Sequence, residues 1–410
     1  MKHARCFLVM ILILFMLSAC GPMLAEAGLG FSPVLHATRP NEQGPELRIA
    51  TLTPTPTPAP TPEPVKLTAT VWQAMPRVPI LMYHRFDVQP GATSYAYTTS
   101  LSDFEGHLSS LYEAGYSLVS LQDWLDGKID LPAGRRPLII TIDDVFYGDQ
   151  LSLDENGEPA IYSGVGTLWH FYQNHPDFQF HLSLFYNFGD KQYANTYQNG
   201  VFLVTDGWRQ ARAEAIAWGI EHDAVPANHF YRHPFLNQLS PTQIEWELSE
   251  NDKALREALA LVGKEALAEG LPNILALPYV VWPATEAGKQ VLYDYRSPEG
   301  VPVAAILEAD EATNAKLLPA PFSTDFDRWH VPRINARWGA IDLIRSLKDE
   351  IPAPEICKLG KFDPSHTERP KRIMEAIQAR ITNGRCPMGL YMVNDFIFQA
   401  DSNGVTQISP

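Results

Sequence analysis

The stretch "RPLIITIDD", residues 136–144, indicates how this chain folds. Its run of leucine, isoleucine and threonine is short and rich in β-branched residues, which is typical of a strand buried on both faces. Asp143 and Asp144 follow, and the chain continues into the loop-like "VFYGD". Neighbouring side chains of a regular strand point to opposite faces, so two adjacent aspartates can share one site only where the strand breaks into a loop. The stretch therefore predicts a buried strand with two carboxylates at its carboxyl end.

Strands and helices alternate on both sides of this stretch. The pattern predicts further strands at 78–84, 180–188, 273–279 and 301–310, and helices at 102–115, 208–219 and 239–263. We expect Ser102 with Glu105 to form a capping box for the first helix, and Ser240 with Gln243 to form one for the last. Alternating strands and helices predict an α/β fold with a mostly parallel sheet, either open or closed into a barrel.

Side chains that can bind a metal or transfer a proton lie at or just after the ends of the predicted strands. His84 closes the strand at 78–84, and His229 and His233 follow a strand in "AVPANHFYRHPFL", residues 224–236. The histidine pair is a weak signal alone, and Pro234 disfavours a helix at His233, which indicates a turn. The carboxyl ends of parallel strands meet at one edge, however, and bring these residues near the aspartates.

Two imidazoles and one carboxylate make a three-ligand set for zinc or a similar divalent ion, with positions left open for water. We expect His229, His233 and Asp144 to be these ligands. Asp143 then remains beside the metal-bound water, positioned to accept its proton. The alternative for the aspartate pair is a solvated turn.

Taken together, "TIDD" (141–144) and "NHFYRHP" (228–234) resemble the polysaccharide deacetylases of carbohydrate esterase family four. "VPILMYH" (78–84) and "HVPRI" (330–334) are similar to segments of the branch that acts on poly-N-acetylglucosamine-like envelope glycans. The resemblance covers roughly residues 76–340. It implies a deformed (β/α)-barrel and the hydrolysis of N-acetyl groups from amino-sugar polymers.

The resemblance also implies a role for each matching residue. Asp143 corresponds to the general base, and His84 to the general acid that protonates the leaving amine. Asp144, His229 and His233 correspond to the ligands of a divalent metal, for which we expect Zn²⁺. A histidine satisfied within the core is the alternative for His84.

The sequence departs from the family pattern in two places. Val145 follows the aspartate pair, where the family usually has glycine. "LALPYVVWP" (275–283) keeps the proline and Tyr279 of another motif but lacks its arginine, which orients the base. Arg333 is a candidate to replace that arginine, or else a structural ion-pair partner. Tyr279 and Trp282 are candidates for stacking on a sugar ring, or else for the core.

The N-terminal residues have the composition of an export signal. "MKHARCFLVMILILFMLSAC" (1–20) has basic residues, a short apolar run and small residues before Cys20, and its end resembles a bacterial lipobox. This predicts cleavage before Cys20 and a lipid anchor on its sulfur. The proline- and threonine-rich segment 51–64 predicts a semi-rigid spacer within a tether at 21–75. We therefore expect an extracytoplasmic protein of the bacterial cell envelope.

The rest of the chain divides into two parts. Residues 76–345 are expected to form the barrel, and residues 346–410 a small C-terminal extension with a helix at 369–381 and a strand at 389–398. With Cys6 removed and Cys20 lipidated, Cys357 and Cys386 are expected to form a disulfide. The formal net charge of −15 argues against a nucleic acid partner and favours neutral or cationic ligands.

Three functions are consistent with these features. The first is the metal-dependent deacetylase acting on an extracellular or cell-wall glycan. The second is a catalytically inactive sugar-binding lipoprotein on the same barrel, which Val145 and the missing arginine favour. The third is a glycosidase with its carboxylates among Asp143, Glu308 and Asp310, in which the metal ligands would have no role.

Overall fold

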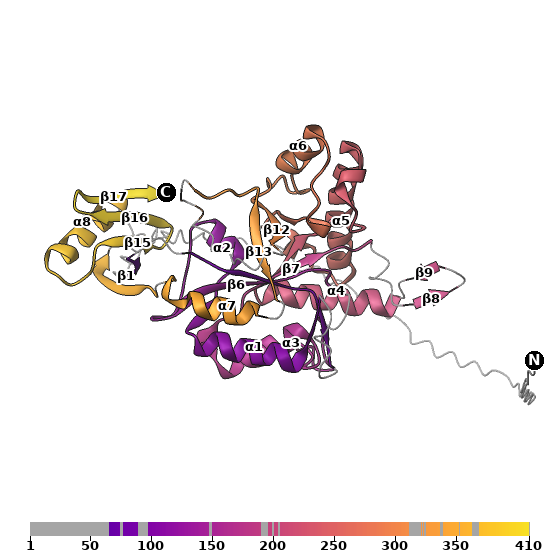
Figure 1. Cartoon of the computed structure of the whole chain (residues 1–410), viewed down its shortest axis with the longest axis horizontal. Coiled ribbons are helices and arrows are strands. Elements are labelled where there is room, and N and C mark those ends of the chain that lie inside the picture. The colour runs from indigo at the N-terminus through magenta and orange to yellow at the C-terminus, as the bar shows by residue number, and fades with distance from the viewer. Residues whose placement is uncertain are drawn as a thin grey trace, which may run out of the picture. The chain divides into compact units, whose positions relative to one another are not determined.

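The computed structural model describes residues 65–73, 77–88, 97–146, 150–189, 196–198, 201–203, 206–310, 321, 323, 325–336, 339–351, 353–362 and 369–409 (Figure 1). The predicted export signal, Cys20 as the predicted lipidation site and the predicted spacer at 51–64 lie outside these ranges. No helix within the ranges is long and apolar enough to cross a membrane.

Within the described residues, seven parallel strands close into a barrel in the order β2-β13-β12-β11-β10-β7-β6. Their bounds are Ile80–Tyr83, Val331–Asn335, Ala305–Asp310, Ile274–Ala276, Ala224–Asn228, Leu182–Tyr186 and Arg136–Ile142, respectively. The pairing of β2 with β6, from Ile80↔Ile139 to Tyr83↔Ile142, closes the ring. The predicted deformed (β/α)-barrel is confirmed.

Strand β6 shows why its sequence lacks the alternation of a half-exposed strand. Leu138, Ile140 and Ile142 belong to one hydrophobic cluster, while Ile139 between them belongs to another. Since neighbouring side chains of a strand point to opposite faces, both faces of β6 are covered by core residues. The aspartates therefore follow a strand that is held firmly in place.

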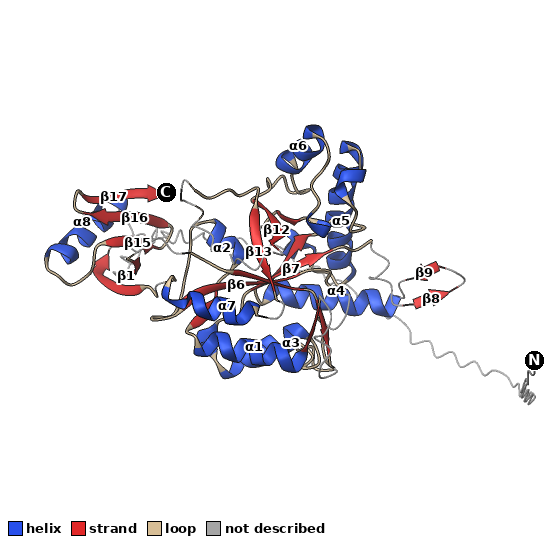
Figure 2. Cartoon of the chain, in the orientation of Figure 1, coloured by secondary structure: helices blue, strands red, loops and turns tan. Residues whose placement is uncertain are grey.

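The helices of the barrel lie between successive strands along the chain (Figure 2). They are α1 (Leu101–Glu113), α2 (Leu121–Leu125), α3 (Gly164–Asn174), α4 (Asp206–Glu221), α5 (Pro241–Leu261), α6 (Glu286–Asp294) and α7 (Ala340–Ser346). The short strands β3 (Arg85–Asp87) and β4 (Thr98–Ser100) pair with each other, as do β8 (Thr196–Gln198) and β9 (Val201–Leu203), while β5 (Tyr116–Leu118) pairs with β6.

One of the two predicted capping boxes is present in the structure, and the other is not. The capping box of Ser240 with Gln243 is confirmed at the start of α5. The box predicted for Ser102 is wrong, because the N-cap of α1 is Ser100, whose hydroxyl accepts the backbone N–H of Asp103 at 3.1 Å. Strand β4 ends at Ser100, so the chain enters the helix directly from the strand.

A second sheet has the strand order β14-β1-β15-β16-β17, with helix α8 (Arg369–Thr382). Its strands are Glu355–Phe362, Val65–Trp72, Gly389–Val393, Phe396–Asp401 and Gly404–Ser409, all paired antiparallel. The expected disulfide Cys357–Cys386 is present, with the two Cα atoms 5.7 Å apart. The predicted single strand at 389–398 is instead a hairpin that turns at Asn394, where φ is 51°.

The predicted end of the tether at residue 75 is wrong. Residues 65–72 form β1, which hydrogen-bonds to β14 on one side and to β15 on the other. Leu67, Ala69 and Val71 alternate along β1 and are buried in a cluster that includes Ile373 and Ile377 of α8. This alternation, which lies just beyond the proline-rich spacer, makes the segment a strand. The barrel is therefore inserted between the first strand of the second sheet and the remaining ones.

Candidate active site

A cavity of about 510 Å³ lies at the carboxyl ends of the barrel strands. Asp143 directly follows β6, His84 follows β2, and His229 follows β10. The residues that line the cavity are Met82, His84, Arg85, Tyr97, Asp143, Asp144, His229, His233, Leu277, Tyr279, Val280, Ala309, Arg333 and Asn335. Most of the site residues predicted from the sequence therefore line one cavity.

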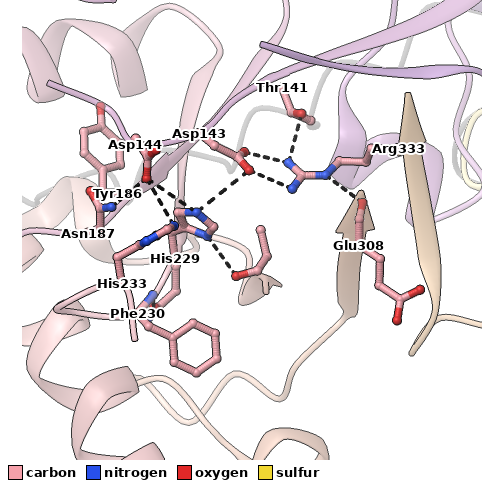
Figure 3. Close-up of polar contacts among 12 residues, drawn as sticks. Thr141, Asp143, Asp144, Tyr186, Asn187, His229, Phe230, His233, Glu308 and Arg333 are labelled. Carbon is pink, nitrogen blue, oxygen red and sulfur yellow. Dashed lines mark hydrogen bonds and ion pairs between the residues drawn. The ribbon is translucent and has the colours of Figure 1, made fainter. Parts of the chain in front are cut away.

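The three predicted metal ligands lie together in this cavity (Figure 3). Asp144, His229 and His233 each present one ligand atom, and the three atoms lie within 4.8 Å of one another. The Nε2 atoms of His229 and His233 are 3.7 Å and 3.4 Å from Oδ1 of Asp144. An oxygen and two imidazole nitrogens converging in this way fit a divalent ion such as zinc.

The orientation of His229 is set by its second ring nitrogen. Nδ1 lies 2.9 Å from the main-chain oxygen of Ala276, so it carries the proton and leaves Nε2 as an acceptor toward the site. Burial lowers the pKa of His229 to about 4, against the opposing effect of the charge on Asp143. The imidazole is therefore neutral near pH 7, as a metal ligand must be.

Two of the three ligands have a left-handed backbone. The φ angles of Asp144 and His233 are 54° and 51°. Such conformations are unfavourable for residues other than glycine and persist where the surroundings fix them. Asp144 is fixed by Asn187, whose Nδ2 donates to Oδ1 at 2.8 Å, and by Gln150, whose Nε2 donates to the main-chain oxygen at 2.8 Å.

Val145 occupies its position without strain from a positive φ. Its side chain is buried, and its backbone N–H donates to the oxygen of Phe185 at 3.2 Å. The left-handed backbone falls on the residues on either side, Asp144 and Phe146, whose φ angles are 54° and 79°. Glycine is therefore not required at residue 145 in this chain.

Asp143 is held by a buried arginine. Arg333 donates from Nη1 to Oδ1 at 2.6 Å and from Nη2 to Oδ2 at 2.7 Å, and it also donates to the Thr141 hydroxyl and the Glu308 main-chain oxygen (Figure 3). Burial alone would raise the pKa of Asp143, but the Arg333 charge, assisted by His229, holds that pKa below its ordinary value. Asp143 is therefore ionised, and Arg333 makes the contact that an orienting arginine requires.

The aromatic candidates lie in different places. Tyr279 lines the cavity and is 53% exposed, with its ring stacked on that of Phe235 at a centroid distance of 4.1 Å. Trp282 does not line the cavity, because its Nε1 donates to the carboxylate of Glu308 and its ring packs on His330. Trp282 is thus not among the residues that line this cavity, and its contact with a sugar stays a prediction.

Of the three carboxylates in the glycosidase alternative, the described side chains are those of Asp143 and Glu308, and Glu308 does not line the cavity. The Glu308 carboxylate is bound by Trp282 and by His330 at 3.0 Å, and it points away from Asp143 (Figure 3). The side chain of Asp310 lies outside the described residues. Among the described residues, the carboxylates that line the cavity are Asp143 and Asp144.

His84 lines the cavity, with its ring 4.7 Å from that of Tyr97 between centroids. The sequence analysis missed Asn187, although it follows β7 directly and so has the same position after a strand that identified Asp143 and His84. It also missed Phe235, the stacking partner of Tyr279. No local pattern distinguishes Phe235 from the other apolar residues around the histidine pair.

No protein-family model and no curated protein matches the sequence. The solved structures that resemble this fold include the following three. The Streptococcus pyogenes deacetylase PplD in complex with acetate has 16% sequence identity and a TM-score of 0.42, and the match covers 66% of this chain and 98% of that one. IcaB from Ammonifex degensii has 20% identity and a TM-score of 0.42, with coverages of 67% and 98%. A polysaccharide deacetylase from Bacillus cereus has 14% identity and a TM-score of 0.43, with coverages of 67% and 69%.

Proposed function

We propose that this protein removes N-acetyl groups from an amino-sugar polymer by metal-dependent hydrolysis. The observation that carries the proposal is the convergence of Asp144, His229 and His233 beside an ionised, arginine-held Asp143. Each of these groups lines the same cavity, which has room for a sugar unit. The ligand set and the base are thus adjacent, as the reaction requires.

Asp144, His229 and His233 would hold the metal, for which Zn²⁺ suits the donor set best. A divalent ion bound there supplies a Lewis acid that polarises the acetamide carbonyl and acidifies the attacking water. His229 contributes neutral Nε2, because its Nδ1 is engaged by Ala276. Asn187 keeps Oδ1 of Asp144 directed toward the two imidazoles.

Asp143 accepts the proton of the attacking water in this proposal. Its Oδ2 lies 3.9 Å from Nε2 of His229, so a water beside the ligand set lies within reach of the carboxylate. Arg333 binds both oxygens of Asp143 and thereby fixes the plane of the carboxylate. His84, which follows β2, the strand paired with β6 in the barrel, donates the proton to the leaving amine. Acetate and a free amine are the products.

Two departures from the family pattern, Val145 in place of glycine and the missing motif arginine, favoured an inactive sugar-binding protein, but the contacts of the site account for both. Val145 stands where no glycine is required, and Arg333 makes the contact with the base that the missing motif arginine would make. Tyr279 presents an exposed ring at the cavity for contact with the sugar. We therefore favour the enzyme over the binding protein.

The export signal and lipobox-like end of residues 1–20 support a location outside the cytoplasm of a bacterium, with a lipid anchor at Cys20. The substrate in that setting is an extracellular or cell-wall glycan. Mass spectrometry of Cys20 in protein from membranes would detect the attached lipid. An unmodified, uncleaved N-terminus would contradict the anchor and leave the proposed chemistry unaffected.

The decisive experiment measures zinc content and acetate release together. We expect the purified protein to bind about one zinc and to release acetate from oligomers of N-acetylglucosamine. His229→Ala should lose both properties. Zinc binding and glycan binding without acetate release would instead support the sugar-binding alternative.

A further inference from the structure

Helix α5 supports the loop that carries the two histidines. Glu247, on this helix, is fully buried, with an exposed fraction of 0%. Its Oε2 accepts the backbone N–H of Arg232 at 2.8 Å, and its Oε1 accepts Nε of Arg232 at 2.8 Å and pairs with Nη2 at 2.7 Å. Its main-chain oxygen accepts the N–H of Tyr231 at 3.1 Å. Glu247 therefore accepts hydrogen bonds from Tyr231 and Arg232, two consecutive residues that lie between His229 and His233.

A second side chain of α5 fixes the start of the same loop. Asn251 lies four residues after Glu247 and therefore on the same face of the helix. Its Nδ2 donates to Oδ1 of Asn228 at 3.0 Å and to the oxygen of Tyr186 at 2.7 Å. Oδ1 of Asn228 also accepts the N–H of Phe230 at 2.9 Å. These bonds hold the backbone on both sides of His229.

Stability alone does not require this arrangement. Burying a carboxylate carries a desolvation penalty, and a well-packed apolar residue of similar volume is often as stabilising as a buried ion pair. The bonds of the Glu247 carboxylate all go to Arg232, one residue before His233. His233 has a φ of 51°, a conformation that persists where the surroundings over-determine it. The buried Glu247 carboxylate thus fixes the backbone of Arg232, directly before His233, whose own backbone is strained.

We propose that Glu247 is a positioning residue of the metal site, and that Asn251 assists it. By holding the main chain of Tyr231 and Arg232, Glu247 sets where the Nε2 atoms of His229 and His233 lie relative to Asp144. This inference rests on the proposed function only in assuming that the three ligands bind a divalent ion. It extends the site to a helix that no cavity-lining residue occupies.

The test compares Glu247→Gln with Glu245→Gln, the same chemical change at an exposed position two residues earlier on α5. The glutamine amide group would face donors of Arg232, so the loop should lose its fixed geometry. We expect zinc affinity, measured by competition with a chelator, to fall about 10- to 100-fold in E247Q and to stay within about twofold of wild type in E245Q. The turnover number should fall while KM changes little, because substrate contacts remain.

Arg232→Gln is a second variant, for the case that E247Q does not fold. The Arg232 side chain is 54% exposed, so this change removes the side-chain contact from the surface, and the Glu247 carboxylate keeps the backbone N–H of residue 232 as a donor. Zinc affinity within about twofold of wild type in either folded variant, with unchanged melting temperature, would overturn the inference. A wild-type protein that binds zinc without releasing acetate would instead refute the proposed function, and the affinity comparison would still decide the role of Glu247.

Discussion

Arg333 and Asp143 meet in a buried, two-pronged ion pair, with Nη1 on Oδ1 at 2.6 Å and Nη2 on Oδ2 at 2.7 Å. Their side chains are only 1% and 2% exposed. Such a pair has high directional specificity, because the planar guanidinium matches the plane of the carboxylate. The ion pair thereby fixes the orientation and the negative charge of the Asp143 carboxylate, as the proposed general base requires.

Removal of the arginine is expected to affect both stability and catalysis. Arg333→Met would leave Asp143 buried without a partner, which should lower the free energy of unfolding by about 3–5 kcal/mol. Acetate release should fall at least tenfold even where the protein is folded. Urea denaturation and an acetate assay measure the two effects. Full activity in a folded R333M variant would show that Arg333 does not orient the base.

The two adjacent aspartates are expected to have separable roles. Asp143→Asn should keep zinc, because Asp143 is not among the three ligands, and should lose about 100-fold or more in turnover. Asp144→Asn should lose zinc affinity together with activity. Metal analysis and acetate release on both variants measure this. Equal loss of zinc in both variants would contradict the separation.

Asn187 is expected to matter through Asp144. Asn187→Ala removes the 2.8 Å hydrogen bond to Oδ1 and should weaken zinc binding about 10-fold or more, since partners of metal ligands commonly contribute that much. Asn174→Ala is a suitable control, because that side chain bonds only with His170 on the exposed face of α3. Chelator competition gives the affinities. No difference between the two variants would refute the prediction.

Zinc is expected to stabilise the barrel. A ligand that binds only the folded state adds about 2.7 kcal/mol at a concentration of 100 times its Kd. The melting temperature should therefore rise with added zinc and fall with a chelator, and His233→Ala should abolish this response. Differential scanning calorimetry provides the measurement. A zinc response that persists in H233A would place the ion elsewhere.

Loss of the disulfide is expected to affect the second sheet and spare the site. The cysteines are 29 residues apart, and a loop of this size corresponds to about 2–4 kcal/mol. Cys357→Ser with Cys386→Ser should lower the stability of the sheet that contains β1 and β14, while the zinc affinity of the folded protein stays unchanged. Thermal unfolding and metal titration test this. A loss of zinc affinity would show that the sheet supports the barrel site.

The sequence by itself determined the main strands and helices of the barrel and the candidate ligands, because both depend on short-range patterns. The β-branched run at 136–144 predicts β6. Asp143 and His84 stand out because each directly follows a strand, and Asp144 stands out because it is next to Asp143. The histidines at 229 and 233 were found by their spacing. Strand ends meet at one edge of a parallel sheet, so position along the chain already implies proximity in space.

Only the tertiary structure decided what depends on contacts between distant segments. The pairing of β2 with β6 closes the barrel. The segment 65–72, predicted as part of the tether, instead forms β1 and pairs with β14, which lies almost 300 residues later in the chain. Arg333 reaches Asp143 across 190 residues, whereas Trp282 turns to Glu308 instead of the cavity. Glu247 resembles any other glutamate of a helix until folding buries it. Burial and long-range hydrogen bonds arise from packing, which periodicity and spacing do not record.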